Sequence, residues 1–303
     1  MYDLISIGGI SVDLFFKGES LTFRDGRFQL AIGGKYVPDY FHSSIGGGGA
    51  NVAIGGSHLG LKTAVMGKIG NNQFKKIILD QLDSHDVSHR LCDIEEDYWN
   101  ISTILLADSG ERSIINYNTP HQHLVNEKNE LTDIFKTKMA YLGNLADVSL
   151  HERIELLRFL KHRKVMTVLN IGIKDCRRPK EQLFPLLNAA DIIIINGHEF
   201  AEIVKAPYKD IHFRENVIQW YIPYLNDQII VVTEGAKGSY TYYDGKIIHQ
   251  IAIKPDKIID TTGTGDGYCA GFIAGYLQSG DIAAAMEKGA KYAAKILAKI
   301  GAN

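Results

Sequence analysis

Residues 260–267 read DTTGTGDG, and the apolar run 268–276 follows them directly. A glycine-rich turn that opens a helix leaves several backbone N–H groups free at the positive end of the helix dipole. Such a turn predicts a site for an anion such as a phosphate group. Asp266 lies inside this site, where its carboxylate would repel a phosphate. It is explained if it takes the proton from a hydroxyl that attacks a phosphoryl group, or if it is only an N-terminal helix residue that the dipole favours.

Two other phosphate-binding motifs do not match this chain. The dinucleotide fingerprint needs a glycine three residues after Gly265, whereas Gly267 stands two residues after it. The GxxxxGK[ST] sequence of a P-loop does not occur in the chain. An NAD-dependent oxidoreductase and a P-loop enzyme are therefore disfavoured.

The rest of the chain alternates between strand-like and helix-like segments. Short apolar runs rich in β-branched residues recur at 4–7, 63–66, 139–142, 165–169, 191–195 and 228–232. Helical spacing is found at 74–82 and 152–160, and two further helices are predicted at 265–278 and 282–300. Strands that alternate with helices predict an α/β fold with a mostly parallel sheet. Because the runs are continuously apolar, we expect the sheet to be covered on both faces.

Two stretches depart from this rhythm and alternate between apolar and polar residues. They cover residues 14–44, with a turn at 25–26, and residues 98–118, with a turn at 108–110. Turns of this composition are typical of antiparallel hairpins. We expect the two stretches to form one small β lid, inserted into an α/β core of residues 1–13, 45–97 and 119–303.

Composition disfavours several classes of partner. The chain has 303 residues, with 33 Lys and Arg against 35 Asp and Glu, so the net charge is −2. This balance disfavours nucleic acid and anionic membrane surfaces as partners.

Three scattered cysteines without a CxxC pair predict neither disulfides nor a zinc cluster, and they fit a cytoplasmic location. No signal peptide and no membrane-spanning run is recognised in the sequence.

A second glycine-rich motif, GGGGAN at residues 46–51, precedes a predicted helix. Four glycines allow a ligand to approach the backbone closely, or allow a hinge between lid and core. Asn51 offers both a donor and an acceptor to a polyol, and it could equally be a helix cap.

Three further motifs follow predicted strands, where ligands bind in parallel sheets. Asn196 and Glu199 follow run 191–195; Glu199 could hold Mg²⁺ through water, or the pair could simply cap a helix. Residues 232–238, VTEGAKG, could lie against a nucleotide or turn into the hairpin 239–251. Asp13, which we expect to close the first strand, could bind vicinal hydroxyls or form an Asx turn.

These five motifs, in this order, resemble those of the ribokinase family of carbohydrate kinases, also called the PfkB family. The family's C-terminal signature, roughly DTxGAGD, matches residues 260–266, and the resemblance covers essentially the whole chain. It implies a ribokinase-like three-layer α/β/α sandwich with a small β-sheet lid. It also implies transfer of the γ-phosphoryl group of ATP, with Mg²⁺, and a homodimer formed through the lid.

The resemblance assigns roles around the signature. It implies that Asp266 is the catalytic base and that the backbone of Gly263, Thr264 and Gly265 forms an anion hole. Thr264 replaces the usual alanine, and a residue of this size still fits.

The resemblance also assigns residues to the sugar, and these are Asp13, Gly47, Asn51 and Asn144. Asn144 stands where ribokinase itself has an acid, so ribose is not singled out as the substrate. The nucleotide would lie against Asn196, Thr233, Gly235 and Gly238. Glu199 would bind Mg²⁺ through water, and Asp260 and Thr262 match part of a site for a monovalent cation such as K⁺.

The predicted function is therefore an ATP-dependent kinase of a small sugar. A nucleoside kinase of the same family is the alternative, with a base slot supplied by the lid aromatics Phe15, Phe16, Phe23 and Phe28. A sugar-binding protein without catalysis is a third hypothesis, which the combination of Asp266, Asn196 and Glu199 disfavours.

Overall fold

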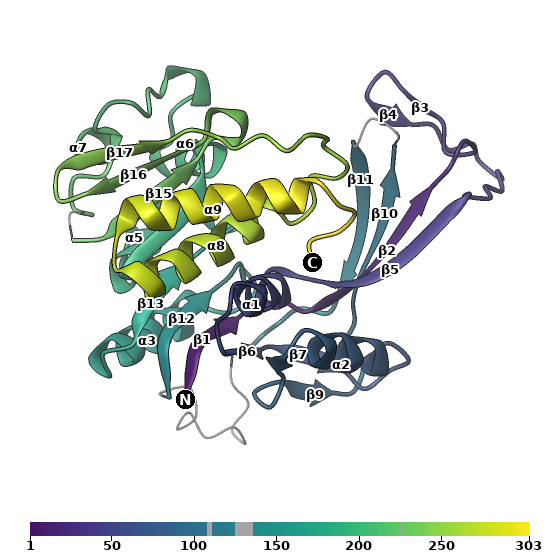
Figure 1. Cartoon of the computed structure of the whole chain (residues 1–303), viewed down its shortest axis with the longest axis horizontal. Coiled ribbons are helices and arrows are strands. Elements are labelled where there is room, and N and C mark those ends of the chain that lie inside the picture. The colour runs from purple at the N-terminus through teal and green to yellow at the C-terminus, as the bar shows by residue number, and fades with distance from the viewer. Residues whose placement is uncertain (108–110, 125–135, 226) are drawn as a thin grey trace.

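The computed structural model describes residues 1–107, 111–124, 136–225 and 227–303. Its centre is a nine-stranded sheet in the order β17-β16-β15-β14-β13-β12-β1-β6-β8 (Figure 1). The strands are β1 (Tyr2–Ile7), β6 (Thr63–Met66), β8 (Val87–Ser88), β12 (Thr137–Leu142), β13 (Met166–Leu169), β14 (Ile192–Asn196), β15 (Ile229–Thr233), β16 (Ser239–Tyr243) and β17 (Lys246–Gln250). All pairs are parallel except β15–β16 and β16–β17, which are antiparallel.

Helices cover both faces of this sheet. One face carries α1 (Gly48–His58), α8 (Thr264–Ser279) and α9 (Ile282–Leu297), with α8 and α9 in yellow in Figure 1. The other carries α3 (Leu150–His162), α5 (Lys180–Ala189), α6 (Gly197–Val204) and α7 (Val217–Tyr221). Alternate strand residues pack on opposite layers: Ile194 packs with α8 and α9, whereas Ile193 and Ile195 pack on the other side. Strands buried on both faces are apolar throughout, which is why their sequences do not alternate.

A second sheet has four strands in the order β11-β10-β2-β5. They are β2 (Ser11–Lys17), β5 (Tyr40–Gly46), β10 (Asn100–Leu106) and β11 (Arg112–Asn118). The two alternating stretches of sequence therefore form one sheet, because β2 pairs with both β5 and β10. The sheet extends to the right of the main body in Figure 1.

The remaining described elements are short or peripheral. They are β3 (Phe23–Arg24), β4 (Arg27–Phe28), β7 (Lys68–Gly70), β9 (Asp93–Glu95), α2 (Lys75–Ser84), α4 (Ile173–Cys176), η2 (Tyr208–Asp210) and η3 (Gly235–Lys237). The predicted turn at 25–26 is confirmed, since Phe23 pairs with Phe28 and both turn residues have positive φ. The predicted turn at 108–110 lies outside the described residues.

Two predictions of element position were wrong. The predicted helix 282–300 ends at Leu297, where a turn begins. Asp13 does not close the first strand, because β1 ends at Ile7 and Asp13 lies within β2 of the second sheet. Gly8 and Gly9 separate β1 and β2, which belong to different sheets. The local sequence pattern does not distinguish these two strands from one longer strand. Among the described residues, no helix is both long and apolar enough to cross a membrane.

Candidate active site

The anion loop, residues 260–266, opens helix α8. Gly263 is the N-cap residue in the left-handed conformation (φ 70°), and no described side chain caps the helix there. Its carbonyl accepts a hydrogen bond from the Gly267 N–H at 2.8 Å, which starts the helix. Backbone N–H groups in the first turn of a helix have no acceptor within the helix, and Gly265 in this turn is exposed. This geometry suits a bound phosphate.

Asp266 is the third residue of α8 and faces helix α1. Its Oδ2 accepts a hydrogen bond from Nδ2 of Asn51 at 2.7 Å. Burial raises the pKa of Asp266, the bond from Asn51 opposes this rise, and the charge of Asp13 adds to it. The carboxylate is therefore a stronger proton acceptor than an exposed aspartate.

The glycines of the second motif let α1 approach the end of β1. Gly47 has a φ of 88°, and a Cβ there would lie 2.5 Å from the carbonyl oxygen of Gly9. Ser6 also donates to the Gly49 carbonyl at 2.7 Å. This close packing places Asn51, which is 6% exposed, beside Asp266. Close contact between backbones therefore explains the glycines at 47 and 49.

Asp13 is buried in β2 of the second sheet. Ser11 donates to its Oδ1 at 3.0 Å. Burial raises the pKa of Asp13, hydrogen bonds from Ser102 and Ser11 lower it, and the charge of Asp260 raises it. The charge of Asp13, in β2 of the second sheet, thus acts on Asp266 at the start of α8.

Asn144 lies at the same edge of the main sheet as the β1 end. It follows β12, the parallel neighbour of β1, and Gly143 donates to the Ile7 carbonyl at 2.8 Å. Its side chain is exposed and lies against Gly172, which follows β13. The structure therefore brings Asn144 to the strand ends, as expected for this residue.

Asn196 and Glu199 form a capping box at the start of α6. The Asn196 side chain accepts from the Glu199 N–H at 2.9 Å, and Glu199 Oε2 accepts from the Asn196 N–H at 2.8 Å. The helix-cap interpretation is therefore confirmed. The bond occupies Oε2, and Oε1 is the oxygen that could serve a metal. Burial raises the pKa of Glu199, whereas its bonds with Asn196 lower it.

The segment after β15 lies next to this box. Thr233 is paired with Asn196 in the parallel β14–β15 ladder. Gly235 and Gly238 both have positive φ, and the Glu234 N–H donates to the Gly238 carbonyl at 2.7 Å, which closes a tight turn. The hairpin interpretation is confirmed, and the turn still presents its backbone at the strand ends.

Asp260 and Thr262 brace the anion loop. Asp260 is fully buried, and its Oδ1 accepts from the N–H and hydroxyl of Thr262 at 2.9 and 2.7 Å. Its Oδ2 accepts from the Gly301 N–H at 3.0 Å. Both carboxylate oxygens of Asp260 accept from protein donors, so Asp260 ties the loop to the segment that contains Gly301.

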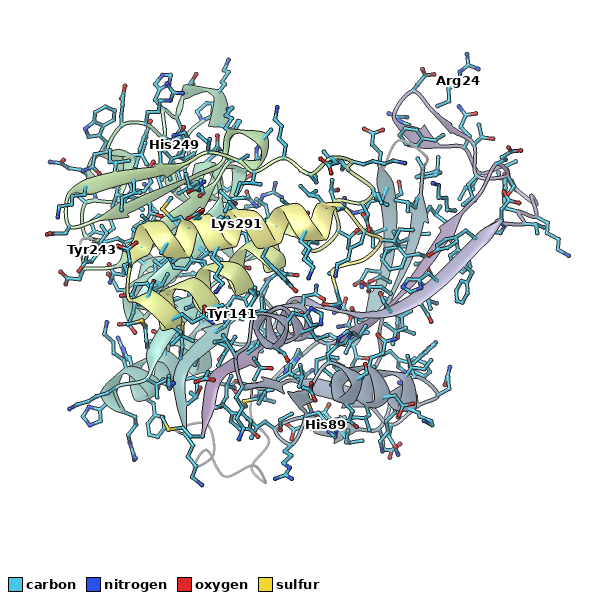
Figure 2. All side chains as sticks on the ribbon, in the orientation of Figure 1. Arg24, His89, Tyr141, Tyr243, His249 and Lys291 are labelled. Carbon is cyan, nitrogen blue, oxygen red and sulfur yellow. The ribbon has the colours of Figure 1, made fainter. Side chains whose placement is uncertain are left out.

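The sequence interpretation missed several residues at this site. Arg112, at the start of β11, donates to the Thr261 hydroxyl and so links the second sheet to the anion loop. Tyr141, labelled in Figure 2, is fully buried, and its hydroxyl has no hydrogen-bond partner among the described residues. Burial raises the pKa of Tyr141, and nearby Cys269 and Asp266 add to the effect. Neither residue belongs to a motif, so no local signal identified them.

The chain is similar over most of its length to proteins named as sugar kinases. The chain is 25% identical over 270 residues to a 5-dehydro-2-deoxygluconokinase of Clostridium botulinum, covering 85% of this chain and 79% of that protein. It is 26% identical over 255 residues to a probable fructokinase-5 of Arabidopsis thaliana, covering 80% and 76%.

Solved structures share the fold. An Arabidopsis thaliana ribokinase complexed with ribose and ATP superposes with a TM-score of 0.82 at 21% identity, covering 99% of this chain and 94% of that one. A nucleoside kinase of Methanocaldococcus jannaschii gives 0.76 at 20% identity, covering 100% and 93%. The predicted ribokinase-like sandwich is thus confirmed. The model of the pfkB family carbohydrate kinases matches residues 4–303, and the chain therefore belongs to that family.

Proposed function

We propose that this carbohydrate kinase transfers the γ-phosphoryl group of ATP to a hydroxyl of a small sugar or sugar acid. The observation that carries the proposal is the contact between Asn51 and Asp266 at the mouth of the anion loop. It joins a partly buried, oriented carboxylate to a helix N-terminus that is suited to phosphate. The relatives named fructokinase and 5-dehydro-2-deoxygluconokinase support a substrate of this class.

In the proposed mechanism, the sugar lies between Asp13, Asn51 and the end of β1. Asp266 accepts the proton of the attacking hydroxyl. The backbone N–H groups at Gly263, Thr264 and Gly265 stabilise the charge that develops on the transferred group. General base catalysis of this kind contributes about 10²–10⁴-fold to the rate.

Mg²⁺ fits the donors at the start of α6. Glu199 has one carboxylate oxygen outside the capping box, and carboxylate oxygens bound directly or through water are typical Mg²⁺ partners. When bound, Mg²⁺ would neutralise charge on the ATP phosphates. Thr233, Gly235 and Gly238 would line the nucleotide, with Asn196 beside them. A monovalent cation such as K⁺ would bind near Asp260 and Thr262, and activity with and without K⁺ tests this.

No observation favours the nucleoside alternative. The base slot of a nucleoside kinase would need the four lid aromatics to be open to a ligand, but Phe15 is fully buried. The rings of Phe23 and Phe28 contact each other with centroids 5.1 Å apart, and Phe16 packs on Phe41 at 5.3 Å. These rings are engaged in the packing of their own segments.

We further propose that a second copy of the chain pairs with the lid. The edge strands of the second sheet carry exposed apolar side chains, among them Phe41 (59%), Ile115 (61%) and Tyr117 (65%). Exposed apolar patches of this kind are typical of interaction sites. Sedimentation should show a dimer that Ile115→Lys weakens; a monomer at all concentrations would contradict the proposal.

The cytoplasmic location stays a prediction from the sparse cysteines.

The test of function is direct detection of ADP formed from ATP and Mg²⁺, with and without K⁺. The acceptor panel should contain fructose, ribose, other sugars, sugar acids and nucleosides. We expect turnover with a sugar or sugar acid. Turnover with nucleosides alone would favour the alternative. Tight sugar binding without ADP release would favour the non-catalytic hypothesis.

A further inference from the structure

The segment beyond the turn that ends α9 packs against the active site, through Gly301, Ala302 and Asn303. Figure 1 shows this end of the chain between α9 and the second sheet. The Gly301 N–H donates to Asp260 at 3.0 Å, and Ala302 is 5% exposed. A Cβ on Gly263 would lie 2.1 Å from that of Ala302, so the segment touches the anion loop itself.

Asn303 makes two hydrogen bonds with one side-chain amide group. Its Nδ2 donates to the Ile45 carbonyl at 2.8 Å and to Asn51 Oδ1 at 3.3 Å. Asn51 in turn donates through its own Nδ2 to Asp266 at 2.7 Å. The three side chains therefore form a chain of bonds in which each amide has one defined orientation.

The opposite orientation of the Asn51 amide would be unfavourable at both ends. It would place Nδ2 of Asn51 against Nδ2 of Asn303, so that two donors face each other. It would also place Oδ1 against the carboxylate of Asp266. Asn303 and Asp266 therefore act together on the Asn51 amide, and Asn303 supports the orientation in which its Nδ2 faces Asp266.

We propose that Asn303 is a positioning residue for Asp266 and acts through Asn51. The inference rests on the proposed function, in which Asp266 is the general base. Asn303 also ties β5 of the second sheet, through Ile45, to the same chain of bonds. The orientation of the base is therefore coupled to the strand that leads into the glycine-rich motif.

The electrostatic setting explains why this orientation matters. Burial raises the pKa of Asp266, and the charge of Asp13 raises it further. The other titratable neighbours, Tyr141 and Cys269, have pKa values raised well above their usual range and stay neutral. The donor of Asn51 is the described interaction that lowers the pKa of Asp266. Losing it would leave the base protonated to higher pH.

Asn303→Asp and Asn303→Ala test this inference. A carboxylate at 303 cannot donate to Asn51 Oδ1, and it would compete with Asp266 for the Nδ2 donor of Asn51. We expect Asn303→Asp to raise the pKa of Asp266 by about one unit or more, since a hydrogen bond to a charged group is worth about 1.5–3 kcal/mol. Asn303→Ala should raise the pKa of Asp266 by less, and this variant keeps the test possible if Asn303→Asp does not fold.

Two readouts separate positioning from general damage. The first is a ¹³C-carboxyl NMR titration, in which Asp266→Asn identifies the Asp266 signal. The second is the pH profile of kcat/KM, whose acid limb should move upward while KM at high pH is unchanged. Gln278→Ala is the matched control, because Gln278 also donates an amide hydrogen bond to a carbonyl, that of Leu59, at the other end of α8. It should leave both readouts unchanged.

The decisive comparison uses the background Asn51→Ala. If Asn303 acts through Asn51, then Asn303→Ala should cause no further shift there. An unchanged Asp266 titration in both Asn303 variants, or a full shift that persists in Asn51→Ala, would overturn the inference. The NMR titration needs no turnover, so absence of kinase activity would refute the proposed function alone.

Discussion

Two glycines of the anion loop, Gly263 and Gly265, should respond in opposite ways to the same substitution. Gly263 has a φ of 70°, and a Cβ there would lie 2.1 Å from the Cβ of the buried Ala302. Gly265 has no described atom within 4 Å of an added Cβ and lies in the first turn of α8. The two alanine variants therefore separate packing from ligand binding within one loop.

For Gly263→Ala we expect a loss of roughly 2–5 kcal/mol in the free energy of unfolding. The left-handed conformation costs a residue with a Cβ about 1–2 kcal/mol, and overpacking adds about 1–3 kcal/mol. For Gly265→Ala we expect a gain of about 0.5–1 kcal/mol, because alanine replaces glycine in a helix. Yet its methyl group would lie where the phosphate is proposed to bind. Losing one such donor contact costs about 10²–10³-fold in rate.

Thermal unfolding without ligands and ADP release with the best acceptor are the two measurements. Gly265→Ala should melt at or slightly above the wild-type temperature and lose about 10²-fold in kcat/KM for ATP. Wild-type kinetics in Gly265→Ala would show that this loop does not bind the phosphate. An unchanged melting temperature in Gly263→Ala would refute the packing argument.

Four further predictions follow from individual side chains. Asp266→Asn should lower kcat by about 10²–10⁴-fold while ADP still binds in calorimetry, and near-normal turnover would remove Asp266 from the role of base. Because the pKa of Asp266 is raised above 3.8, the acid limb of kcat/KM should lie above that pH, with activity rising as the carboxyl loses its proton; a limb at or below 3.8 would contradict this. Asp175→Asn breaks the 2.6 Å ion pair with Arg153 and leaves the arginine charged and fully buried beside a neutral amide. Chemical denaturation should therefore show that the free energy of unfolding falls by about 3–5 kcal/mol. A decrease below about 1 kcal/mol would argue against a stabilising pair. Tyr141→Phe removes a buried hydroxyl without a described partner, and it should raise the free energy of unfolding by about 1 kcal/mol; a clear decrease would indicate a bound water at that hydroxyl.

Local sequence was sufficient for most elements of the main sheet. Runs such as 63–66 and 191–195 coincide closely with β6 and β14, because β-branched side chains buried on both faces produce continuous apolar segments. The start of α8 was predictable from glycine chemistry. Gly263 takes a left-handed N-cap conformation that residues with a Cβ rarely adopt.

Asp13 shows where local interpretation was insufficient. Its segment follows two glycines and looks like the end of a first strand. In the structure it belongs to a strand that pairs with β5 and β10. Which sheet a short strand joins depends on partners far away in sequence, and a periodic pattern carries no information on them.

The sequence by itself determined the α/β class, the positions of the principal strands and helices, and the presence of an anion-binding loop that contains a carboxylate. Each of these depends on residues within one turn or one strand. Only the tertiary structure decided which side chains meet Asp266. Asn51 lies 215 residues from it, Arg112 reaches a loop residue 149 positions away, and Asn303 contacts Asn51 across 252 positions. Such contacts result from strand order and from helix packing on a shared sheet, since burying apolar surface on both faces brings distant segments together.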